Sequence, residues 1–264
     1  MKTVAIATQK GGEGKTTTSV HLAFAAAEEN KKVLFIDFDT QGNSTLVFTE
    51  NSRFAEQEDY SYLTCSDLFS TANSPIKKPY NVAKNIDLIA PDDNLKNYVK
   101  ARVDWFADEL QAPRWVLSHI AKEYDLCIID APPAVGQILA ALLTTADYVL
   151  SPMCMDSFSL DGLAELLETI DSVKNTTNSE LKHMGIIPSQ INTRSKTELD
   201  TLKSLREAYG SLITPYEFYW RYPVKMAIAK KQPVWKGVKG SSHRATANQW
   251  KKNCSTILKE ILND

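Results

Sequence analysis

Short apolar runs alternate with longer segments of helical periodicity along most of this chain. Strand-like runs occur at residues 3–8, 32–37, 86–89, 126–130, 148–153 and 184–191. Between the last two, apolar residues recur at three- and four-residue spacing, as on the inner face of a covering helix, at Leu160, Leu163, Leu167 and Ile170. This alternation predicts a parallel sheet wrapped by helices.

The predicted strands at 32–37 and 126–130 are almost continuously apolar, which is typical of strands buried on both faces. We therefore expect an α/β fold, a mostly parallel twisted sheet with helices on both faces in three layers. A final amphipathic helix is expected at about residues 242–261. Residues 51–80 are polar and lack a strong period, so they should form an irregular excursion or short helices at the sheet's edge. With no repeat, low-complexity tract or linker, residues 1–264 should form a single domain.

The composition is that of a soluble globular protein, with 43% hydrophobic and 23% charged residues. There is no apolar stretch of 18 or more residues, and the N-terminus enters a strand-like run instead of a leader segment. The four cysteines lie far apart, without the paired spacing of a disulfide framework or zinc site. These features predict a cytoplasmic protein with reduced thiols.

Charge is distributed unevenly along the chain. Residues 218–259 contain ten basic residues and no Asp or Glu, which leaves 20 basic residues against 32 acidic ones elsewhere. This segment therefore carries about +10 and the remainder about −12, although the net charge is only −2.

A glycine-rich turn follows the first predicted strand. Gly11, Gly12 and Gly14 precede Lys15 and Thr16, and a helical apolar face continues behind them. Backbone N–H groups of such a turn surround phosphate oxygens, the lysine adds positive charge, and the threonine hydroxyl can hold Mg²⁺. The ordinary phosphate-loop pattern needs a glycine where this chain has Gln9, and an additional lysine, Lys10, stands next to it.

The pattern Lys-Gly-Gly-x-Gly-Lys-Thr at residues 10–16 resembles the deviant Walker A motif of the ParA/MinD family of ATPases. The resemblance implies a P-loop NTPase fold that binds ATP with Mg²⁺. It also implies an ATP-dependent sandwich dimer, in which Lys10 reaches the partner's nucleotide and acts in catalysis with Lys15. The implied nucleotide-binding residues are Lys10, Gly11, Gly12, Glu13, Gly14, Lys15, Thr16 and Thr17.

Two aspartate motifs end predicted strands, where parallel sheets bind ligands. Asp37-Phe38-Asp39-Thr40-Gln41-Gly42-Asn43 resembles the family segment whose second aspartate, here Asp39, orients the attacking water. Asp130-Ala131-Pro132-Pro133 resembles the Walker B element, which implies that Asp130 holds Mg²⁺ through water beside Thr16, with Asp37 as a further water-mediated candidate. Taken singly, aspartates at strand ends are also common helix caps.

Three residues have two open interpretations. Asn192 and Pro215 fall where the family builds its adenine pocket, but either is also an ordinary turn residue. Glu13 occupies a loop position where the family usually has a small or apolar residue, and a carboxylate repels a triphosphate. We expect Glu13 either to turn outward and pair with a cation across the dimer interface or to be a solvated side chain.

The basic segment 218–259 predicts non-specific binding to phosphate backbones, and its resemblance to ParA proteins implies nucleoid DNA as the target. The alternative is a solvated face, and the interleaved aromatic residues are expected to serve as core. The candidate DNA contacts are Arg194, Arg221, Lys225, Lys230, Lys231, Lys236, Lys239 and Arg244.

The resemblance implies a partition ATPase that segregates or positions a plasmid, chromosome or protein cargo. A ParB-like or other cargo adaptor would stimulate hydrolysis. A MinD-like membrane ATPase is the main alternative, because the chain ends in an amphipathic helix, but its last residues are acidic and no membrane partner is expected. A P-loop biosynthetic kinase or synthetase is a third possibility, which would not require Lys10 or the basic segment.

Overall fold

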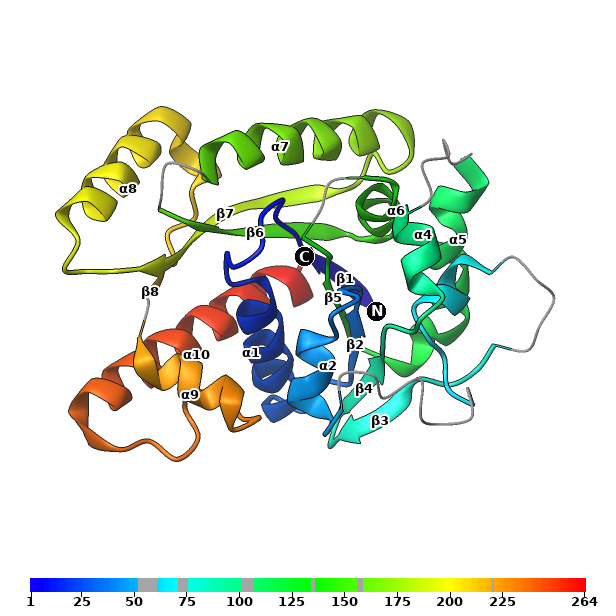
Figure 1. Ribbon diagram of the computed structural model, residues 1–264, viewed down its shortest axis with the longest axis horizontal. Helices are drawn as coiled ribbons and strands as arrows, with labels where there is room; N and C mark the ends of the chain where they lie inside the picture. Colours follow the sequence, from blue (N-terminus) through cyan, green and yellow to red (C-terminus); the bar gives the residue numbers. More distant parts are fainter. Residues whose placement is uncertain (52–60, 71–75, 101–106, 134–135, 156–158, 220) are drawn as a thin grey trace.

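The computed structural model describes all residues except 52–60, 71–75, 101–106, 134–135, 156–158 and 220. Its centre is an eight-stranded sheet in the order β3-β4-β2-β5-β1-β6-β7-β8 (Figure 1). Every strand pair is parallel except β3 with β4. The strands are β1 (Lys2–Ile6), β2 (Val33–Asp37), β3 (Tyr80–Ala83), β4 (Ile86–Ile89), β5 (Leu126–Asp130), β6 (Tyr148–Cys154), β7 (Lys182–Ile191) and β8 (Phe218–Tyr219).

The predicted α/β fold is confirmed, and all six predicted strands are present with ends within two residues of the expected ones. Two strands, β3 and β8, were not predicted. β8 has only two residues, and β3 lies at the edge of the sheet with no fully buried position. Neither strand therefore carries the continuous apolar run that identifies the central strands.

Helices cover both faces of the sheet (Figure 1). They are α1 (Lys15–Glu28), α2 (Asn43–Phe48), α4 (Leu95–Lys100), α5 (Ala107–Ile120), α6 (Gln137–Thr145), α7 (Ser159–Thr176), α8 (Lys196–Tyr209), α9 (Tyr222–Ala229) and α10 (Gly240–Leu262). Three short 3₁₀ helices are η1 (Ser66–Phe69), η2 (Ala121–Glu123) and η3 (Gly210–Leu212). None of the described helices is both long and apolar enough to cross a membrane.

Alternate side chains of each central strand enter opposite halves of the core. In β2, Val33 and Phe35 pack with α1, α9 and α10, whereas Leu34 and Ile36 pack with α5, α6 and α7. Because successive strand residues point to opposite faces, a strand that is covered on both sides must be apolar throughout. This is the physical reason that the central strands could be recognised in the sequence as continuous apolar runs.

The part of residues 51–80 that the structure describes does contain a short helix, as expected, but it also joins the core. Residues 62–64 form isolated bridges, one of them between Thr64 and Ala90, next to the carboxyl end of β4. η1 follows, and its Leu68 is fully buried together with the neighbouring Leu63. Residues 52–60 and 71–75 of this segment lie outside the described residues.

Candidate functional site

The glycine-rich turn joins β1 to α1 at the carboxyl edge of the sheet, where ligands bind in open parallel sheets. Gly12 and Gly14 have φ angles of 86° and 95°, in the left-handed region that favours glycine. Gly14 also caps α1, and a β-carbon there would lie 2.6 Å from the Ser189 Oγ atom. The turn therefore depends on the absence of a side chain at this position.

Lys15, the first residue of α1, is buried against the turn. Its ammonium Nζ donates to the Lys10 carbonyl at 3.1 Å and to the Thr8 hydroxyl at 3.2 Å. Burial lowers the pKa of this ammonium, and the carboxylates of Asp130, Asp39 and Glu13 oppose that shift. Positive charge is thus held inside the turn at the N-terminus of a helix, as anion binding requires.

Two buried carboxylates stand side by side at the ends of adjacent strands, since Asp37 of β2 and Asp130 of β5 are paired in register. Asp130 accepts hydrogen bonds from the Thr16 hydroxyl at 2.8 Å and the Ser19 hydroxyl at 3.2 Å. Burial raises the pKa of both carboxyl groups, and the neighbouring Asp37 raises that of Asp130 further. A cation placed here would relieve this penalty.

Asp37 organises the turn that carries Asp39. Its carboxylate accepts the backbone N–H and the hydroxyl of Thr45, both at 2.7 Å, and the backbone N–H of Asp39 at 3.1 Å. Asp39 itself is half-buried and accepts the Gln41 N–H at 2.9 Å. The carboxylate of Asp37 is therefore engaged within the turn, whereas Asp39 reaches the cleft described next.

An open cleft with a volume of about 940 Å³ brings these groups together. The predicted nucleotide-binding residues on its wall are Gly11, Gly12, Gly14, Lys15, Thr16 and Thr17, and Asp39 lies on it with them. The opposite wall comes from β7, β8 and α9. Three cations predicted to contact DNA, Arg221, Lys225 and Lys231, also line this cleft.

Lys10 is half-buried at the start of the turn and lies away from this cleft. It lines a separate cavity of about 20 Å³ together with Glu13 and residues of β6 and α7. Glu13 is only 6% exposed, and its carboxylate accepts a hydrogen bond from the Cys154 N–H at the end of β6. The expectation of a solvated, outward-turned Glu13 was wrong, because this backbone donor draws the carboxylate inward. Pairing across a dimer interface stays a prediction.

Neither Asn192 nor Pro215 lines the cleft. Asn192 accepts the Arg194 N–H at 3.1 Å and donates its own N–H to Glu198, so it shapes the start of α8. Pro215 lies two residues beyond Ile213, which bridges Ile186, while Phe218 pairs with Ser189. The parallel register thus places Pro215 short of the carboxyl edge. These positions favour the turn-residue interpretation, and adenine contacts by Asn192 or Pro215 stay a prediction.

Sequence reasoning missed three residues that face the loop or share its cleft. Gln190 donates from its side-chain amide to the Gly12 carbonyl, and Ser189 packs against Gly14. Tyr219 lies under Arg221, whose guanidinium carbon is 5.4 Å from the ring centroid. All three follow from the rule that strand carboxyl ends meet at one edge, applied to β7 and β8.

The predicted DNA contacts are exposed, except Arg221, which is half-buried and donates to the Thr193 hydroxyl at 3.0 Å. That bond places Arg221 beside Arg194. Trp250 is buried and stacks on Phe218 at 4.0 Å, which confirms it as core. Trp220 lies outside the described residues. Within the part of the chain that the structure describes, no ion pair involves the predicted contacts Lys225, Lys230, Lys231, Lys236 and Lys239.

Residues 1–183 match a family model described as an AAA domain. Protein IncC of Escherichia coli is 33% identical over 248 residues, which are 93% of this chain and 66% of that protein. The chain thus spans slightly less than two thirds of the length of that relative. The chromosome partitioning protein ParA of Myxococcus xanthus is 30% identical over 77% of this chain and 70% of that protein.

Solved structures of related proteins superpose on this chain over nearly its whole length. The structure of apo McdA from Cyanothece superposes with a TM-score of 0.78 at 26% identity, over 98% of this chain and 99% of McdA. McdA has also been solved in complex with ATP, with a TM-score of 0.80 at 25% identity over 100% of this chain and 96% of McdA. The chain therefore belongs to the ParA/MinD-like family of partition ATPases.

Proposed function

We propose that this protein is a ParA-type partition ATPase that hydrolyses Mg·ATP, dimerises with it and binds DNA without sequence preference. The observation that carries the proposal is the convergence of the glycine-rich turn, Lys15 and Asp39 on one cleft, with Asp130 hydrogen-bonded to Thr16 behind it. Partition relatives and the ATP complex of McdA support the same activity.

The residues present fit ATP with Mg²⁺. The positive φ angles of Gly12 and Gly14 shape a turn before a helix N-terminus, which suits a polyphosphate. The hydroxyl of Thr16 and the carboxylate of Asp130 are oxygen donors held 2.8 Å apart, the hard-ligand chemistry that Mg²⁺ prefers. Mg²⁺ supplies neutralisation of phosphate charge, and it needs only one or two carboxylates in such sites.

Each side chain then has a role in phosphoryl transfer. Lys15 neutralises phosphate oxygens from within the turn, and Asp39, on the same wall of the cleft, orients the attacking water. Lys10 reaches the nucleotide of a second copy. Asp37 acts through the turn that carries Asp39, because its oxygens already accept the Thr45 and Asp39 hydrogen bonds.

The exposed cations around α9 and the start of α10 contact the DNA. Release of counterions from the phosphate backbone drives such binding and requires no base readout. A cargo adaptor of the ParB type would stimulate hydrolysis and release the protein from the nucleoid. The apolar face of α10, including Trp250, Cys254 and Ile257, is buried against the core, so this face does not serve as a membrane anchor.

Two substitutions test the proposal. Lys10→Ala should keep the protein monomeric with ATP and weaken its binding to DNA, because one copy offers only half of the cations of a dimer. Asp39→Ala should still dimerise and stay on DNA, with turnover lower by about 10²-fold or more, because the attacking water is no longer oriented. Light scattering measures dimerisation, phosphate release measures turnover, and co-sedimentation measures DNA binding.

Lys203→Ala is the matched control, since Lys203 is an exposed lysine of α8 far along the chain from the turn. It should behave as the wild type in all three assays. A wild-type protein that does not hydrolyse ATP, or a Lys10→Ala variant that dimerises with ATP, would contradict the proposal.

A further inference from the structure

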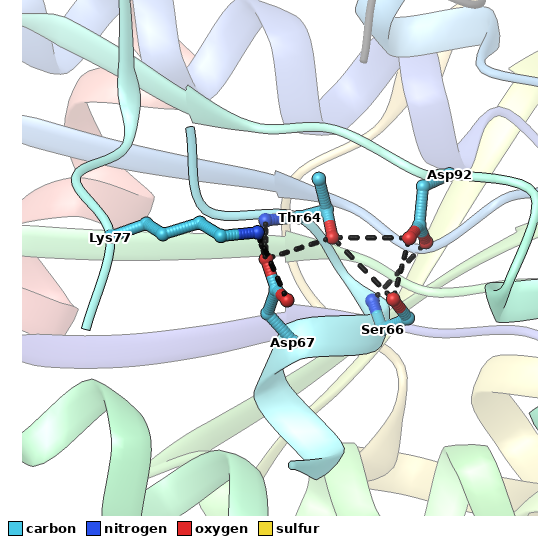
Figure 2. A network of polar contacts seen from close by, with 5 residues as sticks. All are labelled: Thr64, Ser66, Asp67, Lys77 and Asp92. Carbon is cyan, nitrogen blue, oxygen red and sulfur yellow. Dashed lines mark hydrogen bonds and ion pairs between the residues drawn. The ribbon is translucent and has the colours of Figure 1, made fainter. Parts of the chain in front are cut away.

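A buried polar network lies beyond the carboxyl end of β4, outside the cleft (Figure 2). Thr64, Ser66 and Asp92 are 3%, 8% and 5% exposed. The Asp92 carboxylate accepts hydrogen bonds from the Ser66 hydroxyl at 2.5 Å, the Thr64 hydroxyl at 3.2 Å and the Ser66 N–H at 3.3 Å. A buried carboxylate with three donors fixes the backbone that supplies them.

A second carboxylate fixes the same segment from the other side (Figure 2). Asp67 accepts the Thr64 N–H at 3.0 Å and the Thr64 hydroxyl at 3.1 Å, and it pairs with the Lys77 ammonium at 3.1 Å. The Thr64 hydroxyl thus lies within hydrogen-bonding distance of both carboxylates, and its single proton is shared between them. Residues 64–67 are held rigidly although they form no strand of the main sheet.

Cys65 lies at the centre of this segment and points to the turn that carries Asp39. Its thiol donates to the Asp37 carbonyl at 3.1 Å, and its backbone N–H donates to the Ala90 carbonyl at 3.0 Å. Burial raises the pKa of this thiol, which keeps it a neutral donor. The carbonyl that accepts the bond begins the peptide unit leading to Phe38.

A second contact reaches the residue next to Asp39. The ring of Phe38 packs edge-on against Phe69 of η1, with centroids 6.0 Å apart, and Phe69 stacks on Tyr98 of α4 at 4.8 Å. Phe38 is fully buried, so its position is set by this packing. The segment pinned by Asp92 therefore contacts both residues that precede Asp39 in the chain.

We propose that the Thr64–Ser66–Asp92 network, acting through the Cys65 thiol, is a positioning device that sets the placement of Asp39 for hydrolysis. The inference rests on the proposed ATPase function, because it concerns the geometry of that reaction. Displacement of a catalytic group by about 1 Å can cost on the order of 10²-fold in rate, so the support of Asp39 has kinetic consequences. None of the network residues contacts the cleft, so they should not contribute to ATP affinity.

The test compares Cys65→Ala with Cys65→Ser. Both remove the sulfur from the core, but only serine keeps a donor for the Asp37 carbonyl. With Mg·ATP and DNA, we expect Cys65→Ala to lower kcat by about tenfold with KM within about twofold of the wild type, whereas Cys65→Ser restores most of kcat. Asp92→Asn should lower kcat in the same way, because its amide group opposes the Ser66 donors.

Thermal unfolding and KM separate positioning from simple loss of structure. If Cys65→Ala and Cys65→Ser have equal kcat, or if the variants lose activity through a raised KM or unfolding at the assay temperature, the positioning role is wrong. Wild-type and Asp39→Ala turnover are measured alongside. Unaffected turnover in Asp39→Ala, or none in the wild type, would overturn the proposed function itself and this inference with it.

Discussion

Gly14 is a residue at which the glycine-rich turn closely approaches the neighbouring strand β7. Its φ of 95° costs an L-residue strain, and its missing β-carbon leaves room for the Ser189 hydroxyl. Gly11, three residues earlier, has neither constraint, because a β-carbon there would meet nothing within 4 Å. The backbone conformation and the contact with Ser189 therefore require glycine at position 14 but not at position 11.

Gly14→Ala is expected to lower the free energy of unfolding by about 1–3 kcal/mol, because both the backbone conformation and the contact with Ser189 become unfavourable. Urea unfolding followed by circular dichroism measures this change, and ATP binding should weaken with it. Gly11→Ala is the control and should change stability by less than about 1 kcal/mol. Equal effects of the two substitutions would show that the close approach at Ser189 does not constrain the turn.

The Glu13 carboxylate turns inward because the backbone N–H of Cys154 offers it a hydrogen bond. The turn places Glu13 beside the end of β6, where its carboxylate accepts the half-buried Cys154 N–H. A carboxylate satisfies that donor, at the cost of negative charge near Lys15. Only the tertiary structure brings the end of β6 next to the turn, so the orientation of Glu13 could not be predicted from the sequence.

At the scale of elements, His21 ties the helix that follows the turn to the basic segment. One ring nitrogen bonds the Thr17 carbonyl at 2.7 Å, and the other accepts the Val234 N–H at 3.2 Å. Trp250 packs against the ring at 4.6 Å, and the neighbouring Trp235 donates to Glu28 at the end of α1. The helix carrying Lys15 and Thr16 and the segment carrying the cations are therefore one packed unit.

Burial lowers the pKa of His21 to about 4, so the folded protein keeps it neutral where the unfolded chain protonates it. The contribution of neutral His21 to the free energy of unfolding is complete above a pH of about 6.5. It is lost as the pH falls from there towards 4. His21→Gln removes this titration. We expect the stability advantage of the wild type over the variant to shrink by about 2 kcal/mol between pH 7 and pH 4.5.

Urea unfolding of both proteins at each pH measures this difference. Asp37 and Asp130 act in the opposite sense, since burial raises their pKa and the folded state takes up protons as the pH falls. These carboxyl groups are present in both proteins, so their effect cancels in the comparison. A difference between the proteins that does not change with pH would mean that His21 is protonated in the fold.

The sequence predicted strands well where burial on two faces imposed a continuous apolar run, as in β2 and β5. Motifs correctly placed Lys15 and Thr16 at the start of a helix and Asp130 at the end of a strand. Prediction from the sequence failed where tertiary register decides. Pro215 precedes β8, whose register with β7 begins at Phe218 and Ser189, so it falls short of the carboxyl edge. Gln190 and Tyr219 carry no local motif, and only the topology brings them to the turn.

At the scale of the whole molecule, three cations of the basic segment lie on the same side as the cleft that contains the glycine-rich turn. Arg221, Lys225 and Lys231 line the cleft wall, while Lys236 and Lys239 lie further along the segment. Because the remainder of the chain carries the acidic excess, DNA would be attracted to this basic segment. Dimerisation through the turn would place two such sides in one assembly.

This arrangement makes the salt dependence of DNA binding a measure of how many copies contact DNA. For duplex DNA, the slope of log K against log salt is about −0.9 for each phosphate neutralised. Lys236 is exposed, and no described residue forms an ion pair with it. We therefore expect Lys236→Ala to reduce the slope by about 2 in the ATP dimer, since each copy loses one contact, but by about 1 in the Lys10→Ala background.

Lys251→Ala is the control within the same segment, because Glu28 already pairs with that ammonium at 3.0 Å. Its slope should change by less than that of Lys236→Ala in either background. Fluorescence anisotropy with a labelled duplex over a series of salt concentrations measures all the slopes. If Lys236→Ala changes the slope by the same amount in both backgrounds, only one copy contacts DNA. A slope near zero for the wild type would remove counterion release as the source of affinity.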